Sequence, residues 1–265
     1  MTTHSAQLVS GLNMWKKKNK LTFYCSVEGV EQTMPIIPAK EIKYDWIKRA
    51  ALSFTEKKLN VSPTSQDGKI RHTSRCPGIF QIKNQGWIVR TWQDIELDIN
   101  DPEYSWRTPL NQVKLSNGVS MDDVSHHTEM MLKQHLENWP ENAFSQIIKI
   151  NTPWYVKVPK GYVLNQFHPS YLDDNRFTSL PGTYSPDYGM GTINVPMIWH
   201  SKKGKYLIKA GTPIAQLILS KKEDMPFENK VVDEQFKKEE KVKNILETMN
   251  FKRVYKNIID YYKEK

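Results

Sequence analysis

The fold of this 265-residue chain is decided by two consecutive stretches, Gly182-Thr-Tyr-Ser-Pro-Asp-Tyr-Gly-Met-Gly-Thr-Ile-Asn-Val-Pro-Met-Ile-Trp-His200 and Tyr206-Leu-Ile-Lys-Ala-Gly-Thr-Pro-Ile-Ala-Gln-Leu-Ile-Leu219. In the first, residues 192–199 alternate with period two, which is the pattern of a strand with one face in a core. Pro196 interrupts this strand. Because proline cannot donate to a ladder, the strand is expected at a sheet edge or with a bulge at that position.

The second stretch predicts two more strands, which follow a turn at Ser201–Gly204. Tyr206–Ile208 is the first, and Gly211 supplies the break after it. The near-continuous apolar run Ile214–Leu219 is typical of a strand that is buried on both faces. Consecutive strands joined by short turns usually pair, so the sequence predicts a β meander rather than a βαβ unit.

Outside this stretch the pattern mixes strands with helices. Helices are predicted over Pro38–Lys58, from apolar residues at spacing four, and over Ser120–Asn138, where Ser120 is a candidate N-cap. Asn117-Gly118 predicts a hairpin turn before the second helix. Strands are predicted at Leu21–Val27, at Ile79–Ile82 and Trp87–Trp92 as a hairpin, at Asp94–Asp101 with an acidic outer face, and at Phe144–Ile150 and Tyr155–Val158.

These elements predict an α+β fold with a mainly-β core and a helical C-terminal tail. Residues Val231–Lys263 are rich in Lys and Glu, with apolar residues at helical spacing. We expect three parts: an N-terminal α+β region with a basic surface (1–140), a β domain (141–222) and a charged helical tail (223–265).

Composition limits the environment and the partners. Two cysteines, Cys25 and Cys76, favour a reducing compartment. No secretory signal and no apolar run of membrane-spanning length is visible, so a soluble protein of the cytoplasm is expected, with no membrane partner. The net charge is +9, and residues 15–75 hold thirteen Lys/Arg against six Asp/Glu. That segment could contact nucleic acid, although a solvated lysine-rich surface is the favoured interpretation.

A family resemblance rests on the two opening stretches. Gly182-x-x-x-x-Asp187-Tyr188 and Gly211-x-x-Ile-Ala-Gln216-Leu217 resemble two motifs of the trimeric dUTPases, whose relatives the dCTP deaminases share the fold. Pro159-Lys-Gly161 lies where that family places its own Pro-x-Gly segment. The likeness covers residues 150–220 and implies a dUTPase-like β-fold, a β-barrel or jelly-roll, for the C-terminal half.

The departures from the family concern its chemistry. The resemblance places Ser185 where the family has the Asp that activates the attacking water, while Asp187 keeps the second Asp. The phosphate-contacting Arg-Ser-Gly motif would fall at His168-Pro-Ser170, where the Ser remains and the Arg is absent. The family closes its site with a glycine-rich C-terminal arm, and this chain has no glycine after Gly211.

A second resemblance covers more of the chain. Cys76-Pro-Gly-Ile79, Asn151-Thr-Pro-Trp-Tyr-Val-Lys-Val-Pro-Lys-Gly-Tyr162 and Gly211-Thr-Pro-Ile-Ala-Gln216 resemble marks of uncharacterised proteins encoded by tailed phages, particularly marine ones. This implies a viral origin and a place in the cytoplasm of the infected bacterial host or in the virion, and it implies no activity.

Two functions from different classes therefore stay open. The first is a non-catalytic binding or assembly protein on a degenerate β scaffold, expected to be a homo-oligomer, with a trimer among the candidates and other phage proteins as further partners. The second is a nucleotide-processing hydrolase or deaminase with an altered site. The catalytic residues are not assigned; the candidate ligand-binding residues are His168, Ser170, Asp187, Tyr188, His200 and Gln216. No metal or cofactor is assigned, and Mg²⁺ enters only with the enzyme alternative.

Overall fold

The computed structural model describes residues 20–47, 49, 77–110, 113–114, 120–127, 139–223 and 225–242. The chain divides into two units, Met1–Lys222 and Glu223–Lys265. The expected boundary at residue 140 falls inside the first unit. The reason is that, in each of the three larger sheets, a strand before residue 140 pairs with a strand after it.

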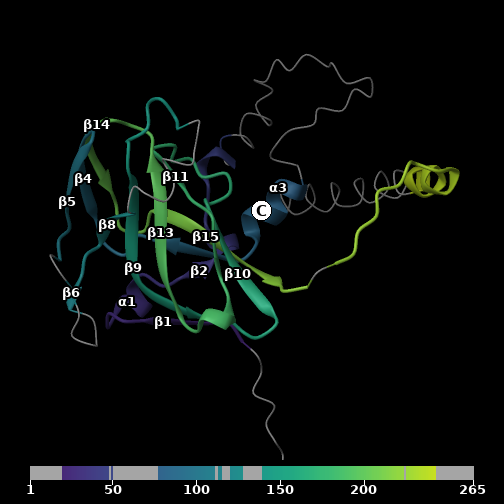
Figure 1. The fold of residues 1–265 in the computed structure, drawn as a ribbon, viewed down its shortest axis with the longest axis horizontal. Coiled ribbons are helices and arrows are strands. Elements are labelled where there is room, and N and C mark those ends of the chain that lie inside the picture. Colours follow the sequence, from purple (N-terminus) through teal and green to yellow (C-terminus); the bar gives the residue numbers. More distant parts are fainter. Residues whose placement is uncertain are drawn as a thin grey trace, which may run out of the picture. The chain divides into compact units, whose positions relative to one another are not determined.

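Antiparallel sheets make up most of the first unit (Figure 1). The first sheet has the order β1-β9-β13-β11, with β8 also paired to β9, and the second has the order β12-β10-β15-β3-β2. A three-stranded sheet, β14-β4-β5, and the pair β6-β7 complete the set. Each is an open sheet, so within the described residues the protein is mainly β and no sheet closes into a barrel.

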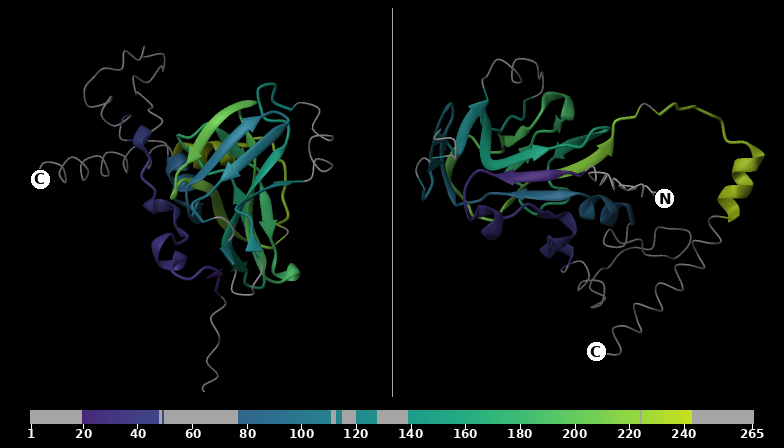
Figure 2. Two further views of the ribbon diagram at one scale, coloured as in Figure 1. Left: turned by 90° about the vertical axis from the view of Figure 1, so that its left-hand side faces the viewer. Right: turned by 90° about the horizontal axis from the view of Figure 1, so that it is seen from below.

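The strand bounds are β1 Thr22–Cys25, β2 Ile37–Pro38, β3 Trp87–Arg90, β4 Ile95–Asn100, β5 Glu103–Arg107, β6 Val113–Lys114, β7 Ser120–Met121, β8 Val124–His127, β9 Ile147–Lys157, β10 Tyr162–Phe167, β11 Phe177–Ser179, β12 Gly182–Tyr184, β13 Gly191–Trp199, β14 Lys203–Ile208 and β15 Pro213–Lys221. The helices are α1 Val30–Thr33 and α3 Pro77–Asn84, with 3₁₀ turns η1 Ala39–Glu41 and η5 Pro186–Tyr188. Residues 20–47 run along one side of the sheets (Figure 2).

The core lies between the sheets and follows from alternation. Alternate residues of β13 are fully buried, from Ile193 to Trp199, and every second residue of β4 is also buried, from Ile95 to Ile99. Phe177 stacks on Trp199 at 6.1 Å between ring centroids. One continuous apolar cluster joins these side chains to Leu164, Ile214 and Leu217 of the second sheet. Removal of this apolar surface from water holds the three sheets together.

The expectation for Pro196 was wrong, because β13 is an interior strand between β9 and β11 and its irregular register lies between Thr192 and Asn194. The backbone oxygen of Pro196 accepts from the N–H of Leu180, just beyond the end of β11 at Ser179. The missing N–H of Pro196 would point to this same side. The missing N–H of Pro196 therefore faces a position beyond the last residue of β11, so no residue of that strand loses a hydrogen-bond donor.

The predicted meander was also wrong, although its strands are confirmed. β13 pairs with β9 and β11, β14 pairs with β4, and β15 pairs with β10 and β3. The run Ile214–Ile218 in β15 is buried throughout, as its near-continuous apolar pattern predicted. Three consecutive strands thus enter three sheets, because each finds partners for its buried face far away in the sequence.

The segment predicted as a strand at Ile79–Ile82 is the helix α3, and only its partner strand, β3, is confirmed. Pro77 suits a first helical turn, and a buried glutamine from β15 holds the carbonyls at the other end. The helix predicted over 38–58 is absent from residues 38–44. There Pro38 pairs with Trp87 and the Ala39 N–H donates to the Gly86 carbonyl. Residues 45–47 and 49 are helical, as predicted, and residues 48 and 50–58 lie outside the described residues.

The helix predicted over 120–138 was wrong at its start, where β7 and β8 lie. Pairing of Val124–His127 with β9 fixes these residues as a strand of the first sheet. Residues 128–138 lie outside the described residues, as does the Asn117-Gly118 turn between the paired strands β6 and β7. Two predicted strands at 144–158 are one, because β9 continues through Asn151–Trp154 and pairs there with β1 and β13.

In the second unit, residues 234–242 are helical, as predicted for the tail, and residues 243–265 lie outside the described residues. Among the residues that the structure describes, no helix is long and apolar enough to cross a membrane.

Candidate functional site

Gln216 lies at the centre of the candidate site, on β15 opposite Phe167 of β10 and Ile88 of β3. Its side chain is fully buried. The Nε2 amide donates to the carbonyl oxygens of Ile82 (2.7 Å) and Gln85 (2.8 Å) at the end of α3. Its Oε1 accepts from the backbone N–H of Ser170 at 3.0 Å. Gln216 therefore fastens α3 and the turn at Ser170 to the second sheet.

A second buried pair stands beside it. Tyr184 on β12 donates its hydroxyl to Oε1 of Gln166 on β10, at 2.9 Å. The Gln166 amide in turn donates to the Asn194 carbonyl at 3.2 Å, which links the two larger sheets. Burial raises the pKa of Tyr184 to about 12, so the phenol stays protonated at neutral pH.

Asp187 and Tyr188 lie in the turn η5, between β12 and β13, and both are exposed. The Asp187 carboxylate accepts from the Nζ of Lys222 and from the Ser185 hydroxyl, the latter at 2.9 Å. Hydrogen bonds and charge from Lys222, together with the Ser185 hydrogen bond, hold the pKa of Asp187 below its ordinary value. Ser185 thus caps this turn in the position where the resemblance placed the catalytic Asp.

His168 follows β10 and is half-buried against Phe177. Its Nδ1 accepts the backbone N–H of Ser179 at 3.1 Å, which requires the lone pair of a neutral ring. Burial lowers the pKa of His168, the nearby His200 lowers it further, and Asp174 acts in the opposite direction.

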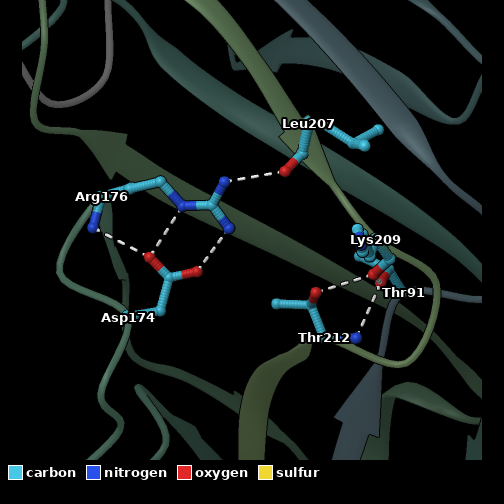
Figure 3. Close-up of polar contacts among 6 residues, drawn as sticks. All are labelled: Thr91, Asp174, Arg176, Leu207, Lys209 and Thr212. Carbon is cyan, nitrogen blue, oxygen red and sulfur yellow. Dashed lines mark hydrogen bonds and ion pairs between the residues drawn. The ribbon is translucent and has the colours of Figure 1, made fainter.

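His200 follows β13 and is exposed, with its Nε2 2.7 Å from the hydroxyl of Thr178. Beside it Arg176 grips Asp174 with two side-chain hydrogen bonds (2.9 and 2.6 Å) and donates to the Leu207 carbonyl at 2.8 Å (Figure 3). Burial would raise the pKa of Asp174, but the hydrogen bonds and charge of Arg176 outweigh it and hold the pKa below its ordinary value. This clamp ties the loop before β11 to β14.

Figure 3 also shows the junction that supports the start of β15. The hydroxyls of Thr91 and Thr212 both donate to the Lys209 carbonyl at 2.7 Å, and the Thr212 N–H donates to the Thr91 hydroxyl at 3.2 Å. The break predicted at Lys209–Pro213 is thus a turn that is held by hydrogen bonds to Thr91, the residue after β3.

The six candidate residues form two groups rather than one pocket. His168, Ser170 and Gln216 lie near the start of β15, with His200 beyond the end of β13 on the side of His168. Asp187 and Tyr188 lie before the start of β13. Nine residue steps separate Gly191 from His200, or roughly 30 Å of strand. Both histidines therefore lie far along the strands from Asp187 and Tyr188, and the structure does not bring the six residues into one pocket.

Sequence reasoning missed the partners that hold these groups. Lys222, which pairs with Asp187, and the clamp of Asp174 and Arg176 were not singled out. The spacing Asp-x-Arg was a usable signal for the clamp, because a short loop places such side chains close together. Nothing in the sequence pointed to α3 as the partner of Gln216, because that contact spans 134 residues.

The neutral state of His168 makes the stability of the protein pH-dependent. The pKa of His168 is lowered in the folded protein, so the stabilisation is present above the unfolded pKa of about 6.5 and is lost as the pH falls through the folded value. His168→Asn keeps an acceptor near the position of Nδ1 but cannot titrate. We expect its melting temperature to fall less than that of the wild type between pH 7 and pH 5. Equal losses in the two proteins would contradict this role.

Within the described residues, no group of three or more His, Cys, Asp or Glu side chains could hold a metal ion. Most of the hydrogen bonds at the site join one strand or turn to another. In comparisons with known proteins, no family model matches the chain and no curated protein matches it.

Proposed function

We propose that this chain is a non-catalytic binding or assembly protein, built on a degenerate dUTPase-like β scaffold and encoded by a tailed phage. The phage origin rests on the resemblance of the segments at 76–79, 151–162 and 211–216. The scaffold rests on two motif residues whose strands both pair with β10: Gly182 of β12 is opposite Gln166, and Gln216 of β15 is opposite Phe167.

One observation carries the non-catalytic assignment: the polar groups that a nucleotide would need are used inside the fold. The side-chain amide of Gln216 donates to two carbonyls at the end of α3, and its oxygen accepts from the Ser170 N–H. The two carbonyls that it holds belong to the C-terminal end of α3, which carries the negative end of the helix dipole. A phosphate group placed there would meet carbonyl oxygens instead of N–H groups.

Exposed apolar side chains support the proposal that this protein binds a partner protein. In the second unit Phe227 is 88% exposed and Val231 is 93% exposed. Met225, Val232, Phe236 and Val242 add to them. The described part of the second unit, residues 223 and 225–242, does not bury these side chains, and exposed apolar surface of this kind is typical of interaction sites. A homo-oligomer, with a trimer among the candidates, would cover it, as would another phage protein.

A turnover assay separates this proposal from the enzyme alternative. The full-length protein is incubated with dUTP and with dCTP, with and without Mg²⁺, and release of pyrophosphate and of ammonia is followed. We expect no turnover above the rate without protein. Turnover that His168→Asn or Asp187→Asn abolishes would overturn the proposal in favour of an altered nucleotide hydrolase or deaminase.

Light scattering tests the assembly part. The expected mass is a multiple of 31.0 kDa at micromolar concentration. Phe227→Ser combined with Val231→Ser should lower that mass, because it removes apolar surface from the second unit without touching the first. A monomeric mass across the whole concentration range would count against self-assembly and direct the search to other partners.

A further inference from the structure

Four segments of the first unit meet at one end of the two larger sheets, the lower end in Figure 1. They are the start of β1, the β9–β10 turn, the β12–β13 turn and the end of β15. Thr22 pairs with Lys157, Gly191 with Val156 and Tyr162 with Lys221, while the Lys222 N–H donates to the Gly161 carbonyl at 2.9 Å. Segments up to 200 positions apart in the sequence therefore share one surface, here called the basic end.

The basic end collects positive charge. Five exposed lysines lie in its four segments, which cover residues 20–22, 157–162, 184–191 and 221–222: Lys20, Lys157, Lys160, Lys221 and Lys222. Asp187 is the one carboxylate in these segments, which gives them a net charge of +4. In contrast, five basic and five acidic residues cancel over 94–107 and 201–209, around the three-stranded sheet. The excess is thus local, although the whole chain is basic.

Aromatic rings stand among these lysines. Tyr188 is 90% exposed on the turn η5, where the Ser185 hydroxyl accepts from the Asp187 N–H. Gly189 follows with φ of 76°, a conformation that glycine adopts at no steric cost. Met190 is 57% exposed on the same turn, and Tyr24, opposite Tyr155 in the first sheet, is 46% exposed. A fixed turn therefore presents an open ring face close to Lys222, at the same end of the sheets as the other lysines.

We propose that the basic end binds a single-stranded polynucleotide, with its phosphates on the lysines and an unpaired base stacked on Tyr188. Lysines that follow a backbone, combined with exposed aromatic rings, are the usual means of binding single strands without sequence preference. The apolar surface here consists of Met190 and two tyrosines that carry hydroxyls. This suits base stacking better than insertion into a lipid surface, which favours Trp, Phe and Leu. The proposal is independent of the non-catalytic assignment.

The direct test uses the full-length protein and fluorescein-labelled 20-mers of dT and of U, followed by fluorescence anisotropy at several salt concentrations. About four phosphates should be neutralised, so log K against log salt should have a slope of about −3. The duplex of dT with dA should bind more weakly than dT alone. Absence of binding, or equal affinity for the duplex, would overturn the proposal.

Two variants separate stacking from charge. Tyr188→Ala should weaken binding about 5- to 150-fold, which corresponds to the free energy of stacking one base on an aromatic ring. The slope of log K against log salt should stay unchanged. Tyr188→Phe should bind as the wild type does. If Tyr188→Ala binds as tightly as the wild type, no base stacks on Tyr188 and the assignment fails.

Asp187→Asn should act in the opposite direction. It removes the carboxylate that pairs with Lys222, and one more phosphate contact should make the slope steeper by about 0.7 and tighten binding. Because Asp187 is exposed, the melting temperature should stay within about 2 °C of the wild type. A large loss of stability would instead mark Asp187 as a residue that the turn requires.

A charge control and a membrane control complete the test. The control variant Lys202→Ala with Lys203→Ala removes two exposed lysines near the start of β14 and should leave the affinity within twofold of the wild type. The variant Lys20→Ala with Lys157→Ala removes two lysines of the basic end. It should weaken binding and make the salt slope shallower. Equal effects of the two pairs would mean that only net charge matters. Sedimentation with phosphatidylserine vesicles, without any binding to the oligonucleotides, would replace the polynucleotide with a membrane surface and overturn the proposal.

Discussion

Replacing Asp123 by alanine should lower the free energy of unfolding by about 3–5 kcal/mol and the melting temperature by roughly 10 °C. Asp123 is 2% exposed, and its carboxylate accepts from three neutral donors: Trp92 Nε1 (3.0 Å), Gln93 Nε2 (2.7 Å) and Thr108 Oγ1 (3.1 Å). Alanine would leave the buried donors of Trp92 and Gln93 without this acceptor, while the Thr108 hydroxyl could still donate to the Leu110 carbonyl at 3.2 Å. The effect should be large because the donors follow β3 and β5 while Asp123 precedes β8, so one carboxylate joins three sheets.

Asp122→Ala is the matched control, because the neighbouring Asp122 is exposed and only its backbone carbonyl holds another residue, Asn151. Its melting temperature should stay within about 2 °C of the wild type. Chemical unfolding with urea, followed by tryptophan fluorescence and by circular dichroism, measures both variants. Equal stability of Asp123→Ala and Asp122→Ala would show that the buried network contributes nothing to the junction of the sheets.

The ionisation of Asp123 adds a pH dependence with a defined sign. Burial raises the pKa of Asp123, and the three hydrogen bonds only partly oppose this. A carboxyl whose folded pKa is raised stabilises the protein most below the unfolded pKa of about 3.9, and loses that contribution as the pH rises through the folded value. The stability advantage of the wild type over Asp123→Asn should therefore shrink between pH 4.5 and pH 7. An advantage that grows over this range would contradict a raised pKa.

The strands could be predicted wherever alternation alone decided them. β13, β4 and β15 follow directly from apolar periodicity, because one buried face, or two, leaves a pattern in a few consecutive residues. Their pairing could not be predicted in the same way. β14 lies three residues after β13 and yet pairs with β4, about one hundred residues earlier, because β4 offers the matching buried face. Local turn signals describe a connection but do not identify the partner.

The errors in secondary structure have the same cause. Pro38–Lys58 has helical spacing, and residues 45–47 and 49 are helical, but pairing with β3 and a hydrogen bond to Gly86 hold the start of this segment in an extended form. With Ser120 as the N-cap, Asp123 would lie in the first turn of the predicted helix, whereas in the structure Asp123 is the centre of a buried network. In both places, tertiary contacts outweigh a helix preference that amounts to a few tenths of a kcal/mol per residue.

For the candidate site, the residue types were visible in the sequence and the distances were not. Gln216 and Asp187 both stand in segments that resemble motifs of one family, but they lie near opposite ends of the same strands. Five residue steps, or roughly 17 Å, separate Gln216 from Lys221 along β15, and the residue after it holds Asp187. Convergence of two motifs depends on strand register, which is set by long-range pairing.

Gln216→Ala is the second change with a large expected effect, and it tests whether this residue serves the fold or a ligand. The substitution removes three hydrogen bonds and leaves the Ile82 and Gln85 carbonyls and the Ser170 N–H without their partner. We expect a loss of about 3 kcal/mol, or roughly 6–12 °C in melting temperature. Gln32→Ala, at an exposed position of α1, is the control and should change the melting temperature little.

Gln216→Glu sharpens the same test, because it keeps the shape of the side chain and replaces the amide donor with a carboxyl group. At neutral pH a carboxylate would face two carbonyl oxygens in a buried site, so its folded pKa should be raised and the variant should be far less stable than the wild type. At pH 4.5 the protonated carboxyl can donate to one carbonyl, and the deficit should be smaller. A residue reserved for a ligand would behave otherwise: Gln216→Ala and Gln216→Glu would both melt near the wild-type temperature, and the scaffold interpretation of this site would fail.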